Sequence, residues 1–575
     1  MNELEKMGKV VTTDVLIVGC GLSAMCAALK LKKENKNLDI LCLEKQWFGY
    51  NGKTTKAGHG ALYMAPDDDI DAFCEEQVKE NSYGLFLNDQ EALRVHVNEA
   101  RTHYDEMEEL GAVFAHNEDG SFHYHREFTT KKSSSANIDL DLIVPLQRNA
   151  LGMGVRVMER IYFTDFLTDH GTVVGAVGFH MDTMEFYIFR ARAVILASNE
   201  FNPVVRQMFY GAATGIYAAY EAGAELRNCE QSTNFDLCHR NTANFMYGMH
   251  WVIVNSKGEN IFRKYHCTNY EEIEMGLVLG MIEEVKQGNY PFYADFSQLP
   301  QTSQTEGEGF FQGMLMPLRL DLDKFIFSLS NVEKRLSMPE ISMVTYVFNR
   351  ALKIDLDSKT TVKNLWGLGG MTLAGSAFGG WVHGDGIGYP ARTAFHAAKS
   401  ILKEIDDIEL GEVSTEQVEF FKNRIYAPLN WHGKDLPYQV IHYLDRVICM
   451  PENSMDRNEE TIHNMLQLLK EERENLSRNI YVPEGDGHHL SKAVEARTMI
   501  DLLEITYMAI DARKETRGFQ VRADYPERDD KNWLKWVIMS KGKDGRPQVS
   551  YERIPFEKYK WKPEGWKPET SVMPS

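Results

Sequence analysis

Several broad classes of protein are disfavoured by what the chain lacks. Its eight cysteines are scattered without a Cys-x-x-Cys pair, so no zinc or iron–sulfur motif is encoded locally. No apolar run approaches the ~20 residues that a membrane-spanning helix needs, and the chain does not open on a charged, then apolar leader. The net charge of −20 disfavours binding to nucleic acid or to an anionic membrane. We therefore expect a cytoplasmic protein without a metal site, without nucleic acid and without direct membrane insertion.

The opening of the chain, from Thr13 to Lys45, is typical of a strand, a glycine-rich turn, a helix and a second strand. Gly19 permits the tight turn, and Gly21 lets the backbone approach a pyrophosphate. Glu44 ends the second strand, where its carboxylate would accept hydrogen bonds from both ribose hydroxyls of an adenosine. A glycine-rich turn without a ligand is the alternative, and the unit alone allows NAD or FAD equally. The predicted cofactor-binding residues here are Gly19, Gly21, Leu22, Ser23, Ala24, Glu44 and Lys45.

Further glycine-rich segments follow. Residues 46–66 could wrap a second part of the same cofactor, or be only a long loop. Thr214 and Gly215 stand near the first turn of an expected helix, whose N-terminus can support a cofactor. In the third feature of this kind, a strand near residues 361–367 runs into a long glycine-rich loop and then a helix. From the first of these segments we take Asn51, Gly52, Thr54, Gly58 and Gly60 as cofactor-binding candidates.

The remaining periodicity predicts the framework around these segments. Helices are expected in residues 68–113, followed by a meander with strands at 173–179, 185–191 and 193–197. Apolar stripes predict helices after about residue 412, and Asp544 and Gly545 indicate a hairpin. The strip Tyr559–Glu569 is too polar for a core of its own and could lie on this chain or serve as a docking strip for a partner.

Four places in the chain resemble the flavoprotein subunits of the fumarate reductase, succinate dehydrogenase and adenylylsulfate reductase family. They are the opening motif, residues 186–197, residues 360–397, and the stretch RKETRGFQVRADYPERDDKNW at Arg513–Trp533. Residues 186–197 and the tail look most like the adenylylsulfate reductase branch. The resemblance implies an α/β fold: a Rossmann-like FAD-binding domain with an inserted α+β capping domain and a C-terminal helical domain. The domains would be 1–228 and 346–411 (FAD-binding), 229–345 (cap), 412–532 (helical) and 533–575 (hairpin and tail).

The resemblance also implies how FAD is held. A loop from Gly384 to Arg392 should place the backbone N–H groups of Ile387 and Gly388 at the flavin pyrimidine carbonyl, and Arg392 should open a helix and support the cofactor. Relatives with covalent flavin carry a serine–histidine pair where this chain has Asn51 and Gly52, so non-covalent FAD is expected. The further candidates on these segments are Ala197, Ser198, Asn199, Gly215, Gly370, Gly384, Asp385, Ile387, Gly388 and Arg392.

Several positions depart from the family's pattern. The histidine–tyrosine pair of the succinate and fumarate members is missing, Gly369 and Gly370 replace an acid, and Ser198 and Asn199 replace two glycines. Dicarboxylate chemistry is therefore doubtful. Arg240 is the best match to the family's catalytic arginine, although a structural ion pair is an equal alternative.

These matches predict the function. His239 and His383 are candidate proton donors, or else structural histidines. We expect an FAD-dependent oxidoreductase, acting as a reductase on a small polar or anionic substrate, in an oligomeric assembly with a ferredoxin-like iron–sulfur subunit. The alternatives are an electron-relay subunit without substrate chemistry and an oxygen-dependent amino-acid oxidase.

Overall fold

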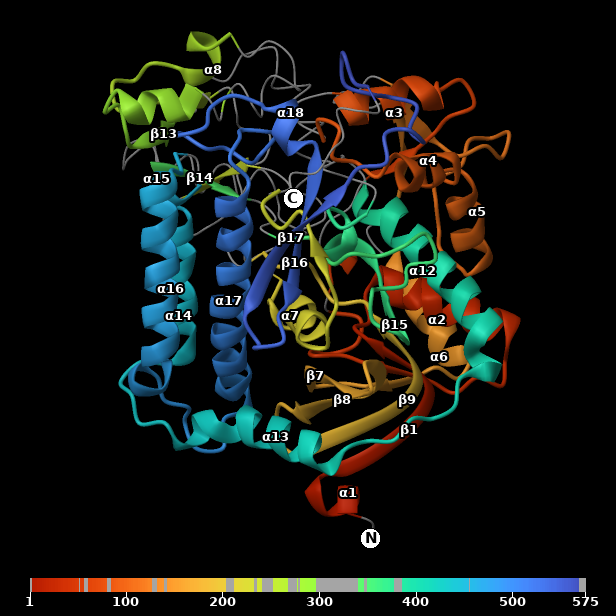
Figure 1. Cartoon of the computed structure of the whole chain (residues 1–575). Helices are drawn as coiled ribbons and strands as arrows, with labels where there is room; N and C mark the ends of the chain where they lie inside the picture. The colour runs from red at the N-terminus through yellow and green to blue at the C-terminus, as the bar shows by residue number, and fades with distance from the viewer. Residues whose placement is uncertain are drawn as a thin grey trace.

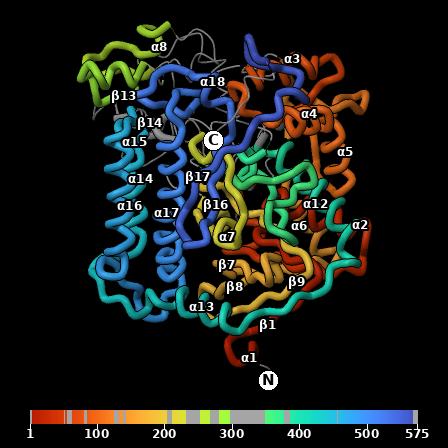
Figure 2. The backbone as a smooth tube through the Cα atoms, viewed as in Figure 1, coloured from red at the N-terminus to blue at the C-terminus, as the bar shows by residue number. Residues whose placement is uncertain are grey.

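The computed structural model describes residues 3–50, 52–55, 60–79, 84–126, 132–138, 142–202, 211–231, 235–239, 252–266, 277, 280–295, 340–345, 349–376, 385–454 and 456–567. Figure 1 shows a sheet flanked by helices, an upright set of long helices beside it, and a smaller unit above these helices. The tube in Figure 2 shows that the C-terminal segment, in blue, runs back over the centre of the molecule toward the N-terminal third.

A seven-stranded sheet forms the centre of the FAD-binding region expected from the sequence. Its order is β6-β2-β1-β9-β8-β7, with β15 also paired to β9. The strands β1, β2, β6, β9 and β15 are mutually parallel neighbours, whereas β7 and β8 form an antiparallel extension. The strand bounds are β1 Lys9–Val18, β2 Ile40–Leu43, β6 Arg156–Met158, β7 Ile161–Asp169, β8 Thr172–His180, β9 Phe186–Leu196 and β15 Leu365–Gly367.

One strand differs from the expectation. The segments 185–191 and 193–197 are not two strands, because β9 runs without a break from Phe186 to Leu196. Its first half pairs with β8 and its second half with β15, both along the edge opposite β1. The neighbour of β9 changes along its length, and this accounts for the change in its apolar pattern, which was interpreted as the boundary between two strands.

The two faces of the sheet belong to two cores, as the alternation of side chains along a strand requires. Val15 and Ile17 of β1 are buried against α2, α6 and α12, whereas Leu16 and Val18 face α7 and the long C-terminal helices. The helix bounds are α2 Leu22–Glu34, α6 Ile143–Gly152, α7 Thr214–Glu221 and α12 Asp385–Glu404. Helices α3 Ile70–Lys79, α4 Gln90–Asn98 and α5 Thr102–Glu109 confirm the helical prediction for residues 68–113.

The helical domain expected after residue 412 is present. Its bounds are α13 Thr415–Tyr426, α14 Pro437–Ile448, α15 Pro451–Ser454, α16 Glu459–Asn479 and α17 Gly487–Ala512. Helices α14, α16 and α17 stand side by side in Figures 1 and 2, and α17 packs against both of the others. Most of α17 is buried, so its apolar positions are packing surfaces.

The inserted unit contains a separate four-stranded sheet of order β11-β14-β13-β12. Its strands are β11 Phe235–His239, β12 Ile253–Val254, β13 Phe292–Ala294 and β14 Glu340–Thr345, and α8 Ile261–Lys264 follows β12. Phe519 and Val521 from the tail are buried in this unit's core, so the tail motif and the insertion pack together. The α/β fold with an inserted α+β unit and a helical C-terminal region is confirmed.

The C-terminal tail forms the expected hairpin, from β16 Lys535–Lys541 and β17 Pro547–Arg553. Beyond it, the rings of Tyr559 and Trp561 are buried against the helices near the N-terminal third. The side chain of Gln90 donates to the carbonyl of Trp561 at 2.7 Å and accepts from its backbone N–H at 3.1 Å. The strip therefore lies on this chain, where its buried aromatic rings complete a core; its role in docking a partner stays a prediction.

Candidate functional site

The sequence-predicted glycine-rich segments meet at one edge of the sheet. The strands β1, β2, β9 and β15 end at Val18, Leu43, Leu196 and Gly367, and they run parallel in register. In open α/β sheets, ligands bind beyond the carboxyl ends of the strands, where helix N-termini also point. The edge is therefore the candidate cofactor and active site.

The first turn has the geometry that a dinucleotide requires. Gly19 has a φ of 111°, and a Cβ atom there would lie 2.5 Å from the carbonyl oxygen of Ala197. A Cβ added at Gly21 would meet no atom of the described residues within 4 Å. A Cβ added at Gly52 would lie 3.6 Å from the Cα of Gly21, so the two glycines are close neighbours. The backbone at Gly21 is therefore open to a ligand. Leu22, Ser23 and Ala24 are buried in the first turn of α2.

The second strand ends as expected. Glu44 is 4% exposed, and one carboxylate oxygen accepts the backbone N–H of Gln46 at 2.9 Å. The ammonium of Lys45, in contrast, forms a 3.0 Å ion pair with Glu495 of α17 and lies over the ring of Tyr162. The side chain of Lys45 thus ties the sheet to the helical domain.

The segment after β9 contributes a hydroxyl that suits a cofactor. The Oγ atom of Ser198 is buried and has no hydrogen-bond partner among the described residues, and Gly215 in the first turn of α7 leaves room for it. Ala197 and Asn199 flank Ser198 at this edge, and Gly370 lies in a short helical turn after β15. Thr54 lies in another short turn, Lys53–Thr55, and Gly60 opens β3 Gly60–Tyr63.

Residues 385–392 of the predicted loop are helical, because α12 begins at Asp385. Ile387 and Gly388 therefore lie in or at the end of its first turn, where backbone N–H groups lack intrahelical acceptors. A helix N-terminus favours negative charge more strongly than an irregular loop would. Arg392 does not open the helix but lies two turns inside it, fully buried.

Three charged residues that the sequence did not single out as a group meet at the same edge. The ammonium of Lys53 contacts Glu200 closely, and the guanidinium of Arg350 lies 3.5 Å from the same carboxylate oxygen. Glu200 is 3% exposed, and its other oxygen would lie 2.6 Å from a Cβ at Gly370. Burial, with the charge of Arg350, holds the pKa of Lys53 well below its ordinary value. We call Lys53, Glu200 and Arg350 the edge triad.

Some of the expected site residues fall outside what the structure describes. Asn51, Gly58, Arg240, His383 and Gly384 lie outside the described residues. His239 is the last residue of β11, and only its backbone is described. The side chain of Asp385, at the start of α12, is not described either. The catalytic assignments to Arg240, His239 and His383 stay predictions.

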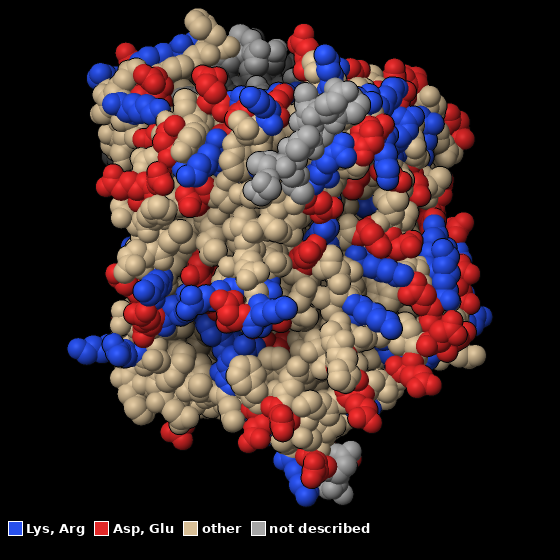
Figure 3. All heavy atoms as spheres, viewed as in Figure 1, with Lys and Arg blue, Asp and Glu red and all other residues tan. Residues whose placement is uncertain are grey.

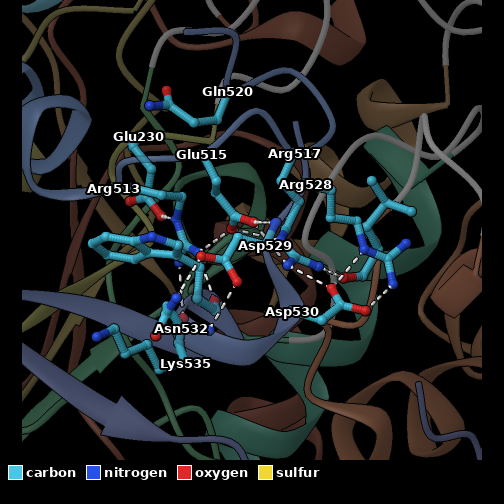
Figure 4. A network of polar contacts seen from close by, with 12 residues as sticks. Glu230, Arg513, Glu515, Arg517, Gln520, Arg528, Asp529, Asp530, Asn532 and Lys535 are labelled. Atoms are coloured by element: carbon cyan, nitrogen blue, oxygen red, sulfur yellow. Dashed lines mark hydrogen bonds and ion pairs between the residues drawn. The ribbon is translucent and has the colours of Figure 1, made fainter. Parts of the chain in front are cut away.

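The tail motif builds a buried ionic network. Arg513 donates to Glu230 at 2.7 Å and to Glu515 at 2.9 Å, and also to the carbonyls of Trp533 and Lys535 (Figure 4). Arg517 donates to both oxygens of Glu515 and to Asp530. Burial alone would lower the pKa of Arg513, but the carboxylates of Glu230 and Glu515 raise it above its ordinary value. The network, hereafter the tail network, fastens the tail to the boundary of the insertion at Glu230.

Comparison with known proteins agrees with this geometry. The model described as "FAD binding domain" matches residues 14–231, and "Fumarate reductase flavoprotein C-term" matches residues 447–567. One relative, from the fumarate reductase (CoM/CoB) of Methanothermobacter marburgensis, is 23% identical over 557 residues, covering 92% of this chain and 97% of the relative. The chain is similar to the fumarate reductase and succinate dehydrogenase flavoproteins over nearly its whole length. It is an FAD-dependent oxidoreductase.

Solved structures of this family share the fold. A variant of E. coli quinol fumarate reductase FrdA aligns with a TM-score of 0.77 at 19% identity, over 95% of this chain and 97% of that chain. The adenylylsulfate reductase from Archaeoglobus fulgidus aligns with a TM-score of 0.72 at 19% identity, over 96% and 97% of the two chains. At these identities the match establishes the fold only, so the choice of branch stays a prediction. Among the helices that the structure describes, none has the length and apolarity to cross a bilayer.

Proposed function

We propose that this chain is the catalytic flavoprotein subunit of a reductase that acts on a small polar or anionic substrate. The observation that carries the proposal is the edge triad, which lies beside Gly370 where β9 and β15 end. When the amine of Lys53 is protonated, two cations and one carboxylate together carry a net positive charge at this position. Charge of this sign favours both an anionic substrate and the negative charge that develops when a flavin is reduced.

Each part of the sheet edge would hold a different part of the cofactor. The turn at Gly19 and Gly21 would take the pyrophosphate, Glu44 the ribose, and Ser198 a polar atom nearby, since its hydroxyl is buried without a partner in the described part of the chain. The first turn of α12 would direct backbone N–H groups at the pyrimidine end. When bound, FAD supplies hydride transfer at N5. The role of the edge triad is to hold positive charge at the site and to exclude water from it.

The catalytic group that contacts the substrate is proposed to be Arg240, with His239 or His383 as the proton donor. A guanidinium binds carboxylates and related anions in a bidentate manner and stabilises charge as a hydride adds. Arg240→Gln should abolish turnover while the flavin stays bound. Near-normal turnover would remove Arg240 from the site.

We further propose that FAD is bound non-covalently, because Asn51 and Gly52 stand where covalent relatives carry serine and histidine. Acid precipitation tests this attachment directly. The supernatant should turn yellow; colour that stays with the pellet would contradict non-covalent binding.

The electrons are proposed to come from a ferredoxin-like iron–sulfur subunit in an oligomeric assembly in the cytoplasm. The sequence carries no local iron–sulfur cluster motif, so one-electron transfer needs a separate protein as the carrier. On the face in Figure 3, Lys and Arg are interspersed with Asp and Glu around a broad uncharged area.

We also propose that the chain is divided into five segments. These are residues 1–228, 229–345, 346–411, 412–532 and 533–575.

The experiment is anaerobic reduction of the purified flavoprotein, followed by mixing with candidate oxidants. Fumarate and adenylylsulfate are the first candidates, with an oxidised ferredoxin and oxygen as separate arms. We expect a small anionic substrate to reoxidise the flavin within the turnover time. Reoxidation by ferredoxin alone would replace the catalytic proposal with an electron-relay role, and reoxidation by oxygen alone would indicate an oxidase.

A further inference from the structure

Arg392 is the most unusual buried side chain in the described part of the chain. It is 0% exposed, and none of its three guanidinium nitrogens has a hydrogen-bond partner among the described residues. The ring of Tyr389 lies beside it, with the ring centroid 5.0 Å from the guanidinium carbon, and the charge of Arg392 acts on Glu99 and His103. A guanidinium carries five N–H donors and keeps its charge in proteins, and buried donors are nearly always satisfied. A cation in this state therefore needs a partner from outside the described residues.

Two histidines lie beside Arg392, in the space between α12, α4 and α5. The ring of His96 packs edge-on against Tyr389, with centroids 5.5 Å apart, and is stacked with His103 at 6.3 Å. His103 is 2% exposed, and neither of its ring nitrogens has a hydrogen-bond partner within the described ranges. We call Arg392, His96 and His103 the α12 basic cluster.

The acid nearest to the cluster already has a partner. Glu99 pairs with His396 at 2.7 Å, whereas its distance to His103 is 3.8 Å, too long for a hydrogen bond. Its side chain is 34% exposed, so it lies toward the surface end of the cluster. No hydrogen bond joins Glu99 to Arg392, and among the described residues the guanidinium has no contacting counterion.

The chemistry of the cluster distinguishes an anion from water. A water molecule could accept one or two hydrogen bonds from the N–H donors but would bring no negative charge to the buried guanidinium. An anion satisfies the donors and the charge together. Burial, with the nearby charges of His96 and Arg392, holds the pKa of His103 well below its ordinary value, so its ring is neutral and carries one N–H donor. A neutral imidazole N–H and a guanidinium together suit a small monovalent anion.

We propose that a small inorganic anion of the chloride class binds between α12, α4 and α5, held by the N–H groups of Arg392 and His103. The site is distinct from the edge triad, since it lies two turns inside α12 rather than at the strand ends. It goes beyond the oxidoreductase reaction and does not depend on it. The bound ion would join α12 to α4 and α5 and would stabilise the folded protein.

The test measures thermal unfolding of the purified FAD-bound protein in sodium gluconate and in sodium chloride at one fixed ionic strength. A ligand that binds only the folded state raises the midpoint in a saturable manner. We expect Tm to rise and level off as chloride replaces gluconate, and Arg392→Met to lose this dependence. Arg546→Gln is the matched control, because Arg546 is a largely exposed arginine on the hairpin, and it should respond as the natural chain does.

The outcomes separate the alternatives. An equal chloride response in the natural chain and in Arg392→Met, or no response in the natural chain, would overturn the proposal. A rise in Tm with fumarate but not with chloride would also overturn it and would assign Arg392 to substrate binding. Should Arg392→Met fail to fold, crystals of the natural chain grown with bromide decide the matter. An anomalous peak beside Arg392 supports the site, and its absence at saturating bromide contradicts it.

Discussion

The tail network and the α12 basic cluster both bury arginine completely, but they treat its charge in opposite ways. Arg513 and Arg517 are 0% and 1% exposed and meet the carboxylates of Glu230, Glu515 and Asp530. Arg392 is equally buried and meets the face of one tyrosine ring. Burial of a charge is therefore compatible with a structural role when its donors are satisfied, and indicates a ligand when they are not.

The largest expected effect comes from breaking the tail network. Glu515→Gln removes the carboxylate that bridges Arg513 and Arg517, and leaves buried N–H donors of both guanidinium groups without that acceptor. Loss of one partner of a buried ion pair costs about 3–5 kcal/mol. Urea unfolding followed by circular dichroism measures the loss. Glu557→Gln, in an exposed pair with Arg553, is the control and should shift stability by less than ~1 kcal/mol. A similar small shift for Glu515→Gln would mean that the network does not hold the tail.

Arg392→Met should behave in the opposite way when no chloride is present. Removing a buried charge that has no counterion relieves a desolvation cost, so we expect stability in gluconate to stay level or rise by roughly 1–2 kcal/mol. The same urea measurement applies. A loss comparable to that of Glu515→Gln would remove the contrast between the two regions.

A smaller, pH-dependent effect on stability is expected at Glu284 in the inserted unit. Like the carboxylates of the tail network, the carboxylate of Glu284 has hydrogen-bond donors around it. Burial would raise the pKa of Glu284, but hydrogen bonds from Lys264, Tyr265, Asn255 and Asn289 lower it from 4.5 to about 2. Its folded pKa lies below the unfolded value, so its contribution is present above pH ~4.5 and is lost as the pH falls toward 2. The loss reaches about 1 kcal/mol by pH 4.

Comparing the natural chain with Glu284→Gln between pH 6 and pH 4 isolates this contribution. Thermal melts at both pH values should show a steeper decline for the natural chain. Parallel declines in the two proteins would show that Glu284 is not held in its charged form.

The sequence predicted the parts of the site that are local in the chain. The turn at Gly19 and Gly21, the acid at Glu44 and a helix after the third glycine-rich segment each depend on a few neighbouring residues, although the start of that helix was predicted at Arg392 and lies at Asp385. The helices after residue 412 and the hairpin at Asp544 were predictable for the same reason, because periodicity and turn residues act over short distances.

What the sequence could not show depends on residues that are far apart in the chain. Lys53, Glu200 and Arg350 come from three segments separated by about 150 residues each, and only the fold brings them together. Likewise, the composition of the final strip suggested a polar tail, while the burial of Trp561 depends on Gln90. Continuity of β9 was missed because its two halves have different neighbours.

The central claim is that the edge triad borders the redox-active ring of FAD, and the midpoint potential of the bound flavin tests it most directly. Glu200→Gln removes a negative charge and should raise the potential, whereas Arg350→Gln removes a positive charge and should lower it. Each shift should be on the order of 30 mV, since 30 mV corresponds to about 1.4 kcal/mol for a two-electron couple. Opposite shifts of this size would support the account. Unchanged potentials in both variants, with FAD still bound, would contradict it.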